Sequence, residues 1–328
     1  MNGLKIENLS SNFNNFTLDN INLNIEKNEY FVLLGQSGSG KTMLLETIAG
    51  LNPCEGKIYY KDKDISILAT QKRDIGFVYQ DFALFPNLNV EQNIRFSSRY
   101  KKITDADVLF ADIVKFLQLK ELLTRDTTTL SGGEKQRVAI ARAIFSKPKI
   151  LLLDEPLSAI DPTLRNSIMK SLKEIHRRYD VITIHVTHNF REASYLADKI
   201  AIIMNGKIQQ VGVAKEVLNH PTNIKVAKFL GFKNIFPTTF LGYTSSNKVF
   251  SVDPNIIKVC TDGDLNTDYI FEGKVEECMG IVDHYKLFVK VNQYSFFIKI
   301  LKRDYEGCYM DREKIIKIGF NKNDVSFI

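Results

Sequence analysis

A short glycine-rich segment constrains the fold of this chain more than any other feature. Residues 35–42 read Gly-Gln-Ser-Gly-Ser-Gly-Lys-Thr and match the pattern G-x-x-x-x-G-K-S/T, in which backbone N–H groups surround a phosphate. An apolar run at 30–34 precedes the segment, and apolar residues at helical spacing follow it. Strand, loop and helix in this order are the context that the pattern requires. A chance glycine-rich turn is the alternative, and the flanking elements argue against it.

The pattern predicts how its residues meet a bound nucleotide. The loop N–H groups and the start of the helix face the anion. Lys41 would reach the β- and γ-phosphates, and the hydroxyl of Thr42 would bind Mg²⁺. We therefore expect the whole segment to bind phosphate, with these members: Gly35, Gln36, Ser37, Gly38, Ser39, Gly40, Lys41 and Thr42.

A second apolar run ends in two carboxylates. Residues 150–153 are uniformly apolar, which favours a central parallel strand. Acidic groups at the end of such a strand are costly unless they meet a cation or solvent. Asp154 fits the acidic partner of Mg²⁺, and Glu155 fits a base that orients an attacking water. A pair of solvent-facing acids is the alternative.

Two more polar residues end predicted strands. Gln80 follows the run at 75–79, and His188 follows the run at 181–186. The carboxyl ends of parallel strands border the crevice in which ligands bind, so His188 is expected to point into it. Gln80 is either a simple polar strand end or a residue that ligates Mg²⁺ or holds a water.

Residues 91–125 interrupt the alternation of strands and helices with a helical pattern, which predicts an inserted helical lobe. Leu130-Ser131-Gly132-Gly133 then opens an apolar helix at 138–145. A Ser-Gly-Gly turn at a helix start is either a simple N-cap or an anion-binding terminus. A glycine pair is costly in a helix, which favours close approach of another group.

Two regions allow less definite predictions. Phe13 and Phe16 stand in a polar loop and are either a local packing plug or a platform for a purine. From about residue 236 short alternating strands replace the helical patterns, which predicts a small β-barrel.

Composition limits the class of protein. The 328 residues suffice for two domains, and the content of 44% hydrophobic and 25% charged residues is typical of a folded soluble protein. Basic and acidic residues are interleaved despite a net charge of +6, so we expect no nucleic-acid partner. We find neither a membrane-spanning run nor a secretory start, and the four cysteines are scattered. We therefore expect a cytoplasmic protein without a cysteine metal cluster.

Several of these motifs occur in a characteristic order. The phosphate loop, Gln80, L-S-G-G, L-L-L-D-E-P, Ser158-Ala159-Ile160-Asp161 and His188 together resemble the ATP-binding-cassette (ABC) ATPases of import systems. The resemblance covers 1–235, and the tail is similar, more weakly, to the oligomer-binding-like (TOBE) barrel of importer ATPases. It implies an α/β P-loop NTPase domain at 1–235 with a helical subdomain at about 87–147, followed by an all-β OB-like domain at 236–328.

The resemblance also implies roles for single residues. Phe13 would stack on adenine, Gln80 would sense Mg²⁺ and the membrane subunit, and Asp154 would support Mg²⁺. Glu155 would be the general base and His188 the γ-phosphate switch. Ser131, Gly132, Gly133 and Asp161 would join the nucleotide contacts, the first three at the γ-phosphate bound by the other protomer. The implied cofactors are ATP and Mg²⁺.

The implied assembly is a homodimer at the cytoplasmic face of the membrane. Two transmembrane permease subunits and an extracytoplasmic substrate-binding protein would complete it. Two departures from the family pattern occur: Asn189 stands where Asp is usual, and Glu134 where Gln is common. Neither removes a group that hydrolysis needs.

The cargo rests on resemblance alone. Residues 184–188, 204–206 and 229–235 look most like importers of molybdate, tungstate or sulfate. Ferric iron, polyamine and sugar importers are alternatives. A soluble ABC ATPase that acts on ribosomes or DNA is disfavoured, because the chain has one cassette and no sustained heptads. A regulatory module with an inactive cassette is disfavoured by the intact Glu155 and His188.

The tail allows two functions. It is either a spacer and dimerisation device or a sensor that binds the transported oxyanion and stops the cassette. For the sensor, the sequence offers turns at 261–264 and 277–280 and the nearby cations Lys299, Lys302 and Arg303.

Overall fold

The computed structural model describes residues 3–13, 15–158, 160–244, 248–260, 265–302 and 312–328. The chain forms two compact units, Met1–Leu218 and Asn219–Ile328, so the units divide earlier than the boundary expected after residue 235. None of the helices in the described part of the chain combines the length and apolar character that a membrane crossing needs.

The first unit is built around a six-stranded sheet in the order β10-β9-β3-β8-β7-β6. Its central strands are parallel, and β10 pairs with β9 in the antiparallel sense. Three of the parallel strands are buried along their whole length, as their continuous apolar runs predict. The strands are β3 (Tyr30–Leu34), β6 (Ile75–Val78), β7 (Ile150–Asp154), β8 (Ile182–Thr187), β9 (Lys199–Met204) and β10 (Lys207–Val213).

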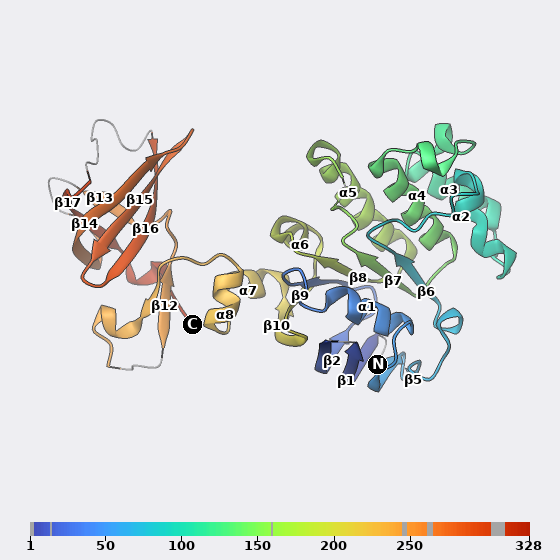
Figure 1. Cartoon of the computed structure of the whole chain (residues 1–328), viewed down its shortest axis with the longest axis horizontal. Helices are drawn as coiled ribbons and strands as arrows, with labels where there is room; N and C mark the ends of the chain where they lie inside the picture. Colours follow the sequence, from blue (N-terminus) through green and yellow to red (C-terminus); the bar gives the residue numbers. More distant parts are fainter. Residues whose placement is uncertain (1–2, 14, 159, 245–247, 261–264, 303–311) are drawn as a thin grey trace. The chain divides into compact units, whose positions relative to one another are not determined.

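A smaller antiparallel sheet, in the order β2-β1-β4-β5, lies below the first one in Figure 1. The helix α1 (Lys41–Ala49) lies between the two sheets, and apolar residues of all three share one core. The segment expected as a loop around Phe13 and Phe16 is a tight hairpin, in which these two residues pair directly. The strands are β1 (Leu4–Phe13), β2 (Phe16–Ile25), β4 (Glu55–Tyr60) and β5 (Lys63–Asp64).

The other face of the large sheet carries α5 and α6, and the helical lobe, which ends in α4, lies beside them (Figure 1). The lobe begins after β6 and returns to the sheet at β7, which confirms the predicted helical insertion. Its members are α2 (Val90–Ile94), η2 (Arg95–Arg99), α3 (Ala106–Phe116), η3 (Lys120–Leu122), η4 (Thr127–Thr129) and α4 (Gly132–Phe145). After β7 come α5 (Pro162–Tyr179), α6 (Phe190–Leu196) and α7 (Ala214–Asn219).

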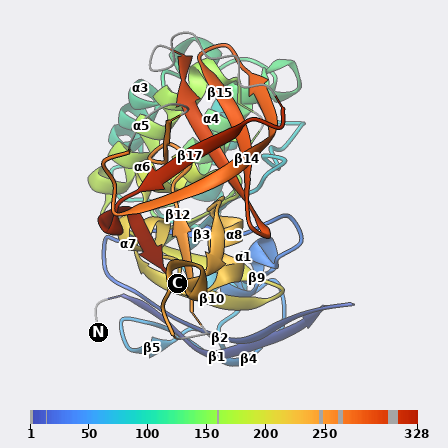
Figure 2. The same ribbon diagram turned by 90° about the vertical axis from the view of Figure 1, so that its left-hand side faces the viewer.

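The second unit begins with α8 (Ile224–Phe229) and is otherwise built from two antiparallel sheets. Figure 2 shows β14, β15 and β17 of the larger sheet in the foreground. Both sheets contribute phenylalanine and aliphatic side chains to one core, which includes Phe236, Phe250, Phe296 and Phe320. The sheets are β11-β12-β18 and β13-β17-β14-β15-β16, with β11 (Ile235–Pro237), β12 (Val249–Val252), β13 (Lys258–Cys260), β14 (Tyr269–Gly280), β15 (His284–Val291), β16 (Tyr294–Leu301), β17 (Ile315–Phe320) and β18 (Val325–Phe327).

The structure corrects one prediction for the tail. Residues 277–280 were expected to form a turn, but they belong to β14 and pair with β15. Cross-strand hydrogen bonds therefore engage backbone groups of this segment. The other predicted turn, 261–264, and Arg303 lie outside the described residues.

Candidate functional site

The phosphate-loop segment joins the end of β3 to the start of α1. Gly40 has a φ of +100°, and a Cβ there would lie 2.7 Å from the ring of Phe16, so only glycine fits. It stands at the N-cap of α1 without any side-chain cap, which leaves N–H groups of the first turn for another acceptor. The hydroxyl of Ser39 is buried without a hydrogen-bond partner in the described residues. These unsatisfied groups fit a bound phosphate.

Lys41 is 5% exposed and turns back over the loop. Its Nζ donates to the carbonyl oxygens of Gly35 and Gln36, at 2.9 Å each, and lies 3.9 Å from Oε1 of Glu155. Burial lowers the pKa of Lys41, and the charges of Glu155 and Asp154 oppose that shift. The ammonium group is therefore held at the loop, beside the two carboxylates that end β7.

Thr42 and Asp154 bring the predicted metal site together. The Thr42 hydroxyl donates to Oδ1 of Asp154 at 3.1 Å. Asp154 is 3% exposed, and this burial raises its pKa. A hydroxyl beside a carboxylate supplies the hard oxygen donors that Mg²⁺ prefers, so the residues present fit the metal. Gln80 is exposed two residues beyond β6, at the same edge of the sheet, because Val78 pairs with Leu153.

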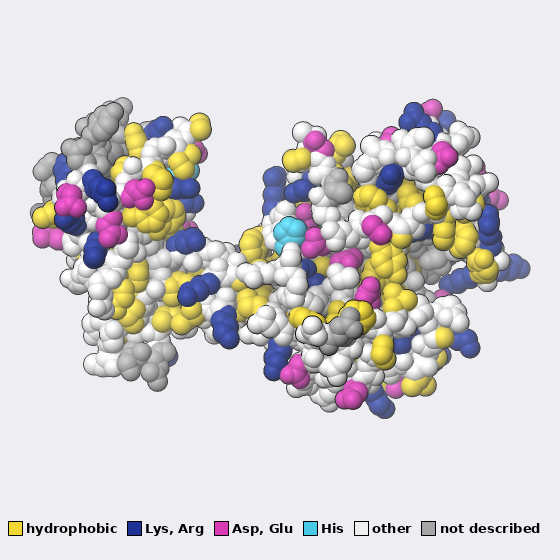
Figure 3. Space-filling view, viewed as in Figure 1, with side chains coloured by type: hydrophobic (Ala, Val, Ile, Leu, Met, Phe, Trp, Pro, Cys, Tyr) yellow, Lys and Arg dark blue, Asp and Glu magenta, His cyan; other side chains and the backbone are white. Residues whose placement is uncertain are grey.

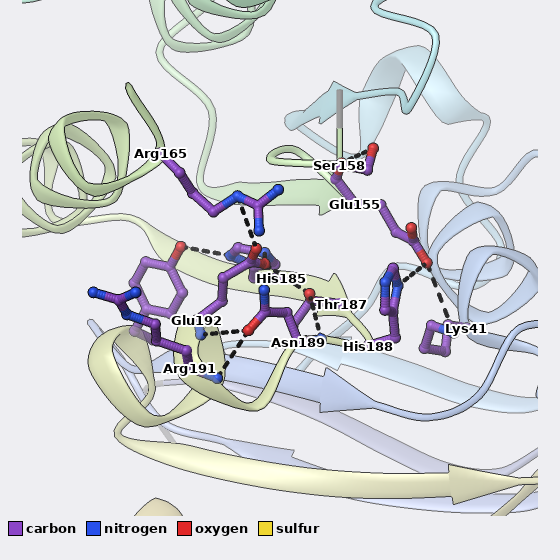
Figure 4. A network of polar contacts seen from close by, with 11 residues as sticks. Lys41, Glu155, Ser158, Arg165, His185, Thr187, His188, Asn189, Arg191 and Glu192 are labelled. Carbon is purple, nitrogen blue, oxygen red and sulfur yellow. Dashed lines mark hydrogen bonds and ion pairs between the residues drawn. The ribbon is translucent and has the colours of Figure 1, made fainter. Parts of the chain in front are cut away.

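Glu155 and His188 face each other across the ends of β7 and β8 (Figure 4). His188 Nδ1 lies 3.3 Å from Oε1 of Glu155, and Lys41 approaches the same oxygen. Glu155 has a φ of +43°, a left-handed conformation that costs energy for a residue with a Cβ. Its N–H donates to the carbonyl oxygen of Val186, which fixes this turn against β8. His188 is the more exposed partner, with 58% of its side chain accessible.

The remaining predicted residues begin other helices. Ser131 caps α4, and its N–H and hydroxyl both donate to Oε2 of Glu134 at 2.8 Å. Asp161 caps α5 by accepting from the N–H of Thr163 at 2.8 Å. In the described residues no hydrogen bond or ion pair joins Ser131 or Asp161 to the phosphate loop. The structure therefore unites residues 35–42, Asp154, Glu155 and His188, and leaves the Ser-Gly-Gly turn separate.

The two aromatic residues of the hairpin have different environments. Phe16 packs against the core between the sheets and touches the phosphate loop at Gly40. Phe13 is 54% exposed. The packing plug is therefore Phe16, and Phe13 is the more exposed aromatic residue.

Two sets of contacts around the site had no counterpart in the sequence analysis. The guanidinium of Arg142 in α4 donates to the carbonyl oxygens of Phe82 and Ala83, at 3.0 and 2.6 Å. Both of these residues have positive φ, so Arg142 holds the turn that follows Gln80.

Behind His188, Glu192 lies buried against Thr187 and His185. Asn189 followed three residues later by Glu192 suggests an N-terminal cap, and Asn189 does cap α6.

A phosphate-binding loop, a hydroxyl–carboxylate pair that fits Mg²⁺ and a carboxylate held beside a histidine are the arrangement of a nucleotide-hydrolysing protein of the phosphate-loop class. Comparisons with known proteins agree. The family model described as ABC transporter matches residues 18–158. The molybdate/tungstate import ATP-binding protein WtpC of Thermococcus kodakarensis is 41% identical over 235 residues, which cover 71% of this chain and 71% of that protein.

Two further comparisons extend this result. WtpC of Methanocaldococcus jannaschii is 40% identical over 297 residues, which cover 89% of this chain and 91% of that protein. A solved dimeric ATP-binding cassette in a post-hydrolysis state with ADP and Pi is 28% identical, with a TM-score of 0.57 over 64% of this chain and 98% of that one. The chain belongs to the family of ABC transporter ATP-binding proteins. It is therefore an ATPase.

Proposed function

We propose that the chain is the ATP-hydrolysing subunit of an importer for molybdate, tungstate or a related oxyanion such as sulfate. The observation that carries the cargo is the length of the alignment with the M. jannaschii molybdate/tungstate protein, whose 297 residues reach into the second unit. Similarity of the first unit alone does not distinguish importers of different cargoes. A spermidine/putrescine import protein of Borrelia garinii is 46% identical over 244 residues, and a ferric-iron import protein of Fusobacterium nucleatum is 41% identical over 236.

The residues of the site divide the chemistry between them. Residues 35–42 hold the phosphates, with Lys41 as the cation that reaches them, and Phe13 supports the base. Thr42, Asp154 and Gln80 hold Mg²⁺, which when bound neutralises phosphate charge. Glu155 accepts a proton from the attacking water and orients it, and His188 holds the terminal phosphate in line. The contacts of Lys41 and His188 with the same Glu155 oxygen support this assignment.

The Ser-Gly-Gly turn supports a dimer. Ser131, Gly132 and Gly133 start α4 apart from the chain's own phosphate loop, so their N–H groups serve the nucleotide of a second copy in this proposal. In this proposal Asp161 joins the same nucleotide contacts. Two such chains work with two permease subunits and an extracytoplasmic binding protein at the cytoplasmic face of the membrane. Basic and acidic side chains intermingle on the first unit in Figure 3, which is consistent with a protein partner rather than nucleic acid.

Uptake of labelled cargo tests this function. The chain, its permease and its binding protein would be expressed in cells without their own molybdate uptake, and molybdate and spermidine uptake would be measured in parallel. Uptake of molybdate that is lost in the Glu155→Gln variant supports the proposal. Uptake of spermidine but not of molybdate would show that the cargo is a polyamine. If neither is taken up although the ATPase is active, the importer function is contradicted.

For the second unit, both a spacer and dimerisation function and an oxyanion-sensor function remain proposals. A cavity of about 720 Å³ is lined by Lys258, Lys299 and His284, whose buried Nε2 has no hydrogen-bond partner in the described residues. These groups favour an oxyanion sensor, whereas Asp283, in contact with His284 Nδ1 at 2.7 Å, opposes it. Calorimetry of the full chain with molybdate, tungstate and sulfate decides between the functions. Anion binding that is lost in the double variant Lys258→Gln/Lys299→Gln supports the sensor function. If the unmodified chain binds no anion at millimolar concentration, the spacer function remains.

A further inference from the structure

Glu192 is a buried carboxylate immediately behind the segment that carries His188. It is the third residue of α6 and is 4% exposed. The Thr187 hydroxyl donates to its Oε2 at 2.7 Å and accepts from the N–H of Asn189 at 3.0 Å. His188 lies between these two hydrogen-bonded residues, so the Glu192 side chain closes the turn in which His188 stands (Figure 4).

Two further donors face the same carboxylate. Nε2 of His185 lies 3.6 Å from Oε2, and Nε of Arg165 lies 4.0 Å from Oε1. Both nitrogens are buried, and neither has a hydrogen-bond partner in the described residues. Burial alone raises the pKa of Glu192, but His185, Thr187 and Arg165 outweigh it and leave the pKa below its ordinary value. The carboxylate therefore stays ionised at neutral pH, at the centre of these donors.

Arg165 connects this cluster to the segment that follows Glu155. Its Nη2 donates to the carbonyl oxygen of Ile160 at 3.4 Å, next to the N-cap of α5. The Ser158 hydroxyl in turn donates to the carbonyl oxygen of Glu155 at 2.9 Å. The Glu192 carboxylate thus contacts the turn of His188 directly through Thr187 and faces Arg165, which bonds to Ile160 in the segment after Glu155, on the side away from Lys41 (Figure 4).

We propose that Glu192 is a positioning residue for ATP hydrolysis, which fixes His188 against Glu155 by accepting a hydrogen bond from Thr187 while its charge faces Arg165. The inference rests on the proposed roles of Glu155 and His188. A carboxylate that only stabilised the fold would have no selective effect on turnover. A positioning residue acts on the geometry of the reacting groups, where a small displacement lowers kcat without weakening ATP binding.

The test compares two variants that keep side-chain shape. Glu192→Gln removes the charge, and Thr187→Val removes the hydroxyl that joins Glu192 to Asn189. Each is expected to lower kcat about 10- to 100-fold with the KM for ATP unchanged. The double variant should lose no more than the worse single variant, because both act through one contact. Glu174→Gln, an exposed glutamate on α5, is the matched control and should have normal kcat.

Nucleotide affinity and thermal melting are measured on the same samples. If Glu192→Gln does not fold, Thr187→Val decides alone. Normal kcat in the folded variants, or a kcat that falls only in proportion to folded protein, overturns the proposal. Glu155→Gln distinguishes a failure of the positioning role from a failure of the proposed role of Glu155. If it is inactive while Glu192→Gln is normal, only the positioning role fails. If it is fully active, the proposed role of Glu155 fails first.

Discussion

Thr42 donates a hydrogen bond to Asp154 from a position 112 residues earlier in the chain. The first residue belongs to α1 and the second ends β7, and the parallel sheet brings the two together. The contact puts a hydroxyl and a buried carboxylate at the edge of the sheet where the phosphate loop begins. Their proposed function is to hold Mg²⁺ beside the phosphates.

Asp154→Asn should stabilise the protein without nucleotide. Burial raises the pKa of Asp154 above 3.8, so between 3.8 and the raised value the folded state binds more protons than the unfolded state. Stability from this group is present below pH 3.8 and is lost as the pH rises through the folded pKa. Melting curves from about pH 4 to 8 should show a higher melting temperature for the variant at neutral pH.

The same variant should lose its response to Mg²⁺ and ATP. A ligand at a hundred times its Kd stabilises the folded state by about 2.7 kcal/mol, and we expect this gain in the unmodified protein. Asp154→Asn should gain much less. Equal stabilisation of both proteins by Mg²⁺ and ATP would contradict a role for Asp154 in the metal site.

Phe13 and Phe16 give a matched pair of substitutions. Phe13→Ala should weaken ATP binding by about 1–3 kcal/mol, the value of a stacked base, with an unchanged melting temperature, because the side chain is 54% exposed. Phe16→Ala should destabilise the fold by about 2–3 kcal/mol, since its partly buried ring packs against the core. Equilibrium binding of a fluorescent ATP analogue and thermal melting measure the two effects. Normal nucleotide affinity in Phe13→Ala would exclude the stacking role.

Gly133 tests the dimer without disturbing the monomer. A Cβ added there would meet only Leu164, at 3.9 Å, so Gly133→Ala should fold normally. In a second chain's ATP site the extra methyl group would obstruct close approach to the phosphate. We expect Glu155→Gln to dimerise when ATP is added, as seen by sedimentation, and Glu155→Gln with Gly133→Ala to remain monomeric. ATP-driven dimers of equal strength in both would contradict this use of the turn.

Local sequence patterns predicted much of the fold and the grouping of site residues. The uniform apolar run before Asp154 became the fully buried β7, and the helical pattern at 91–125 became the lobe between β6 and β7. Strand ends that carry polar residues, such as His188, met at one edge because the strands are parallel. The two departures from the family pattern have local explanations. Asn189 caps α6, and Glu134 completes a capping box with Ser131.

Contacts that depend on tertiary packing could not be predicted. Nothing near Glu192 in sequence indicates that it turns inward to Thr187, since an exposed capping glutamate fits the same pattern. Arg142 and Phe82 are 60 residues apart, and their contact exists only because α4 packs against the turn after β6. The β11-β12-β18 sheet of the tail was not predicted from the sequence because its strands are short. β11 and β18 have three residues each. Short runs carry little periodicity.

The turnover of the Glu155→Gln variant is the sharpest test of the proposed mechanism. The substitution keeps the size of the side chain next to His188 and removes the base. We predict that ATP binds as in the unmodified protein, whereas steady-state hydrolysis falls by about 10²–10⁴-fold, the value of a positioned base. Glu174→Gln serves as the control. Hydrolysis close to normal in folded, ATP-binding Glu155→Gln would contradict the assignment of Glu155 as the base and the mechanism built on it.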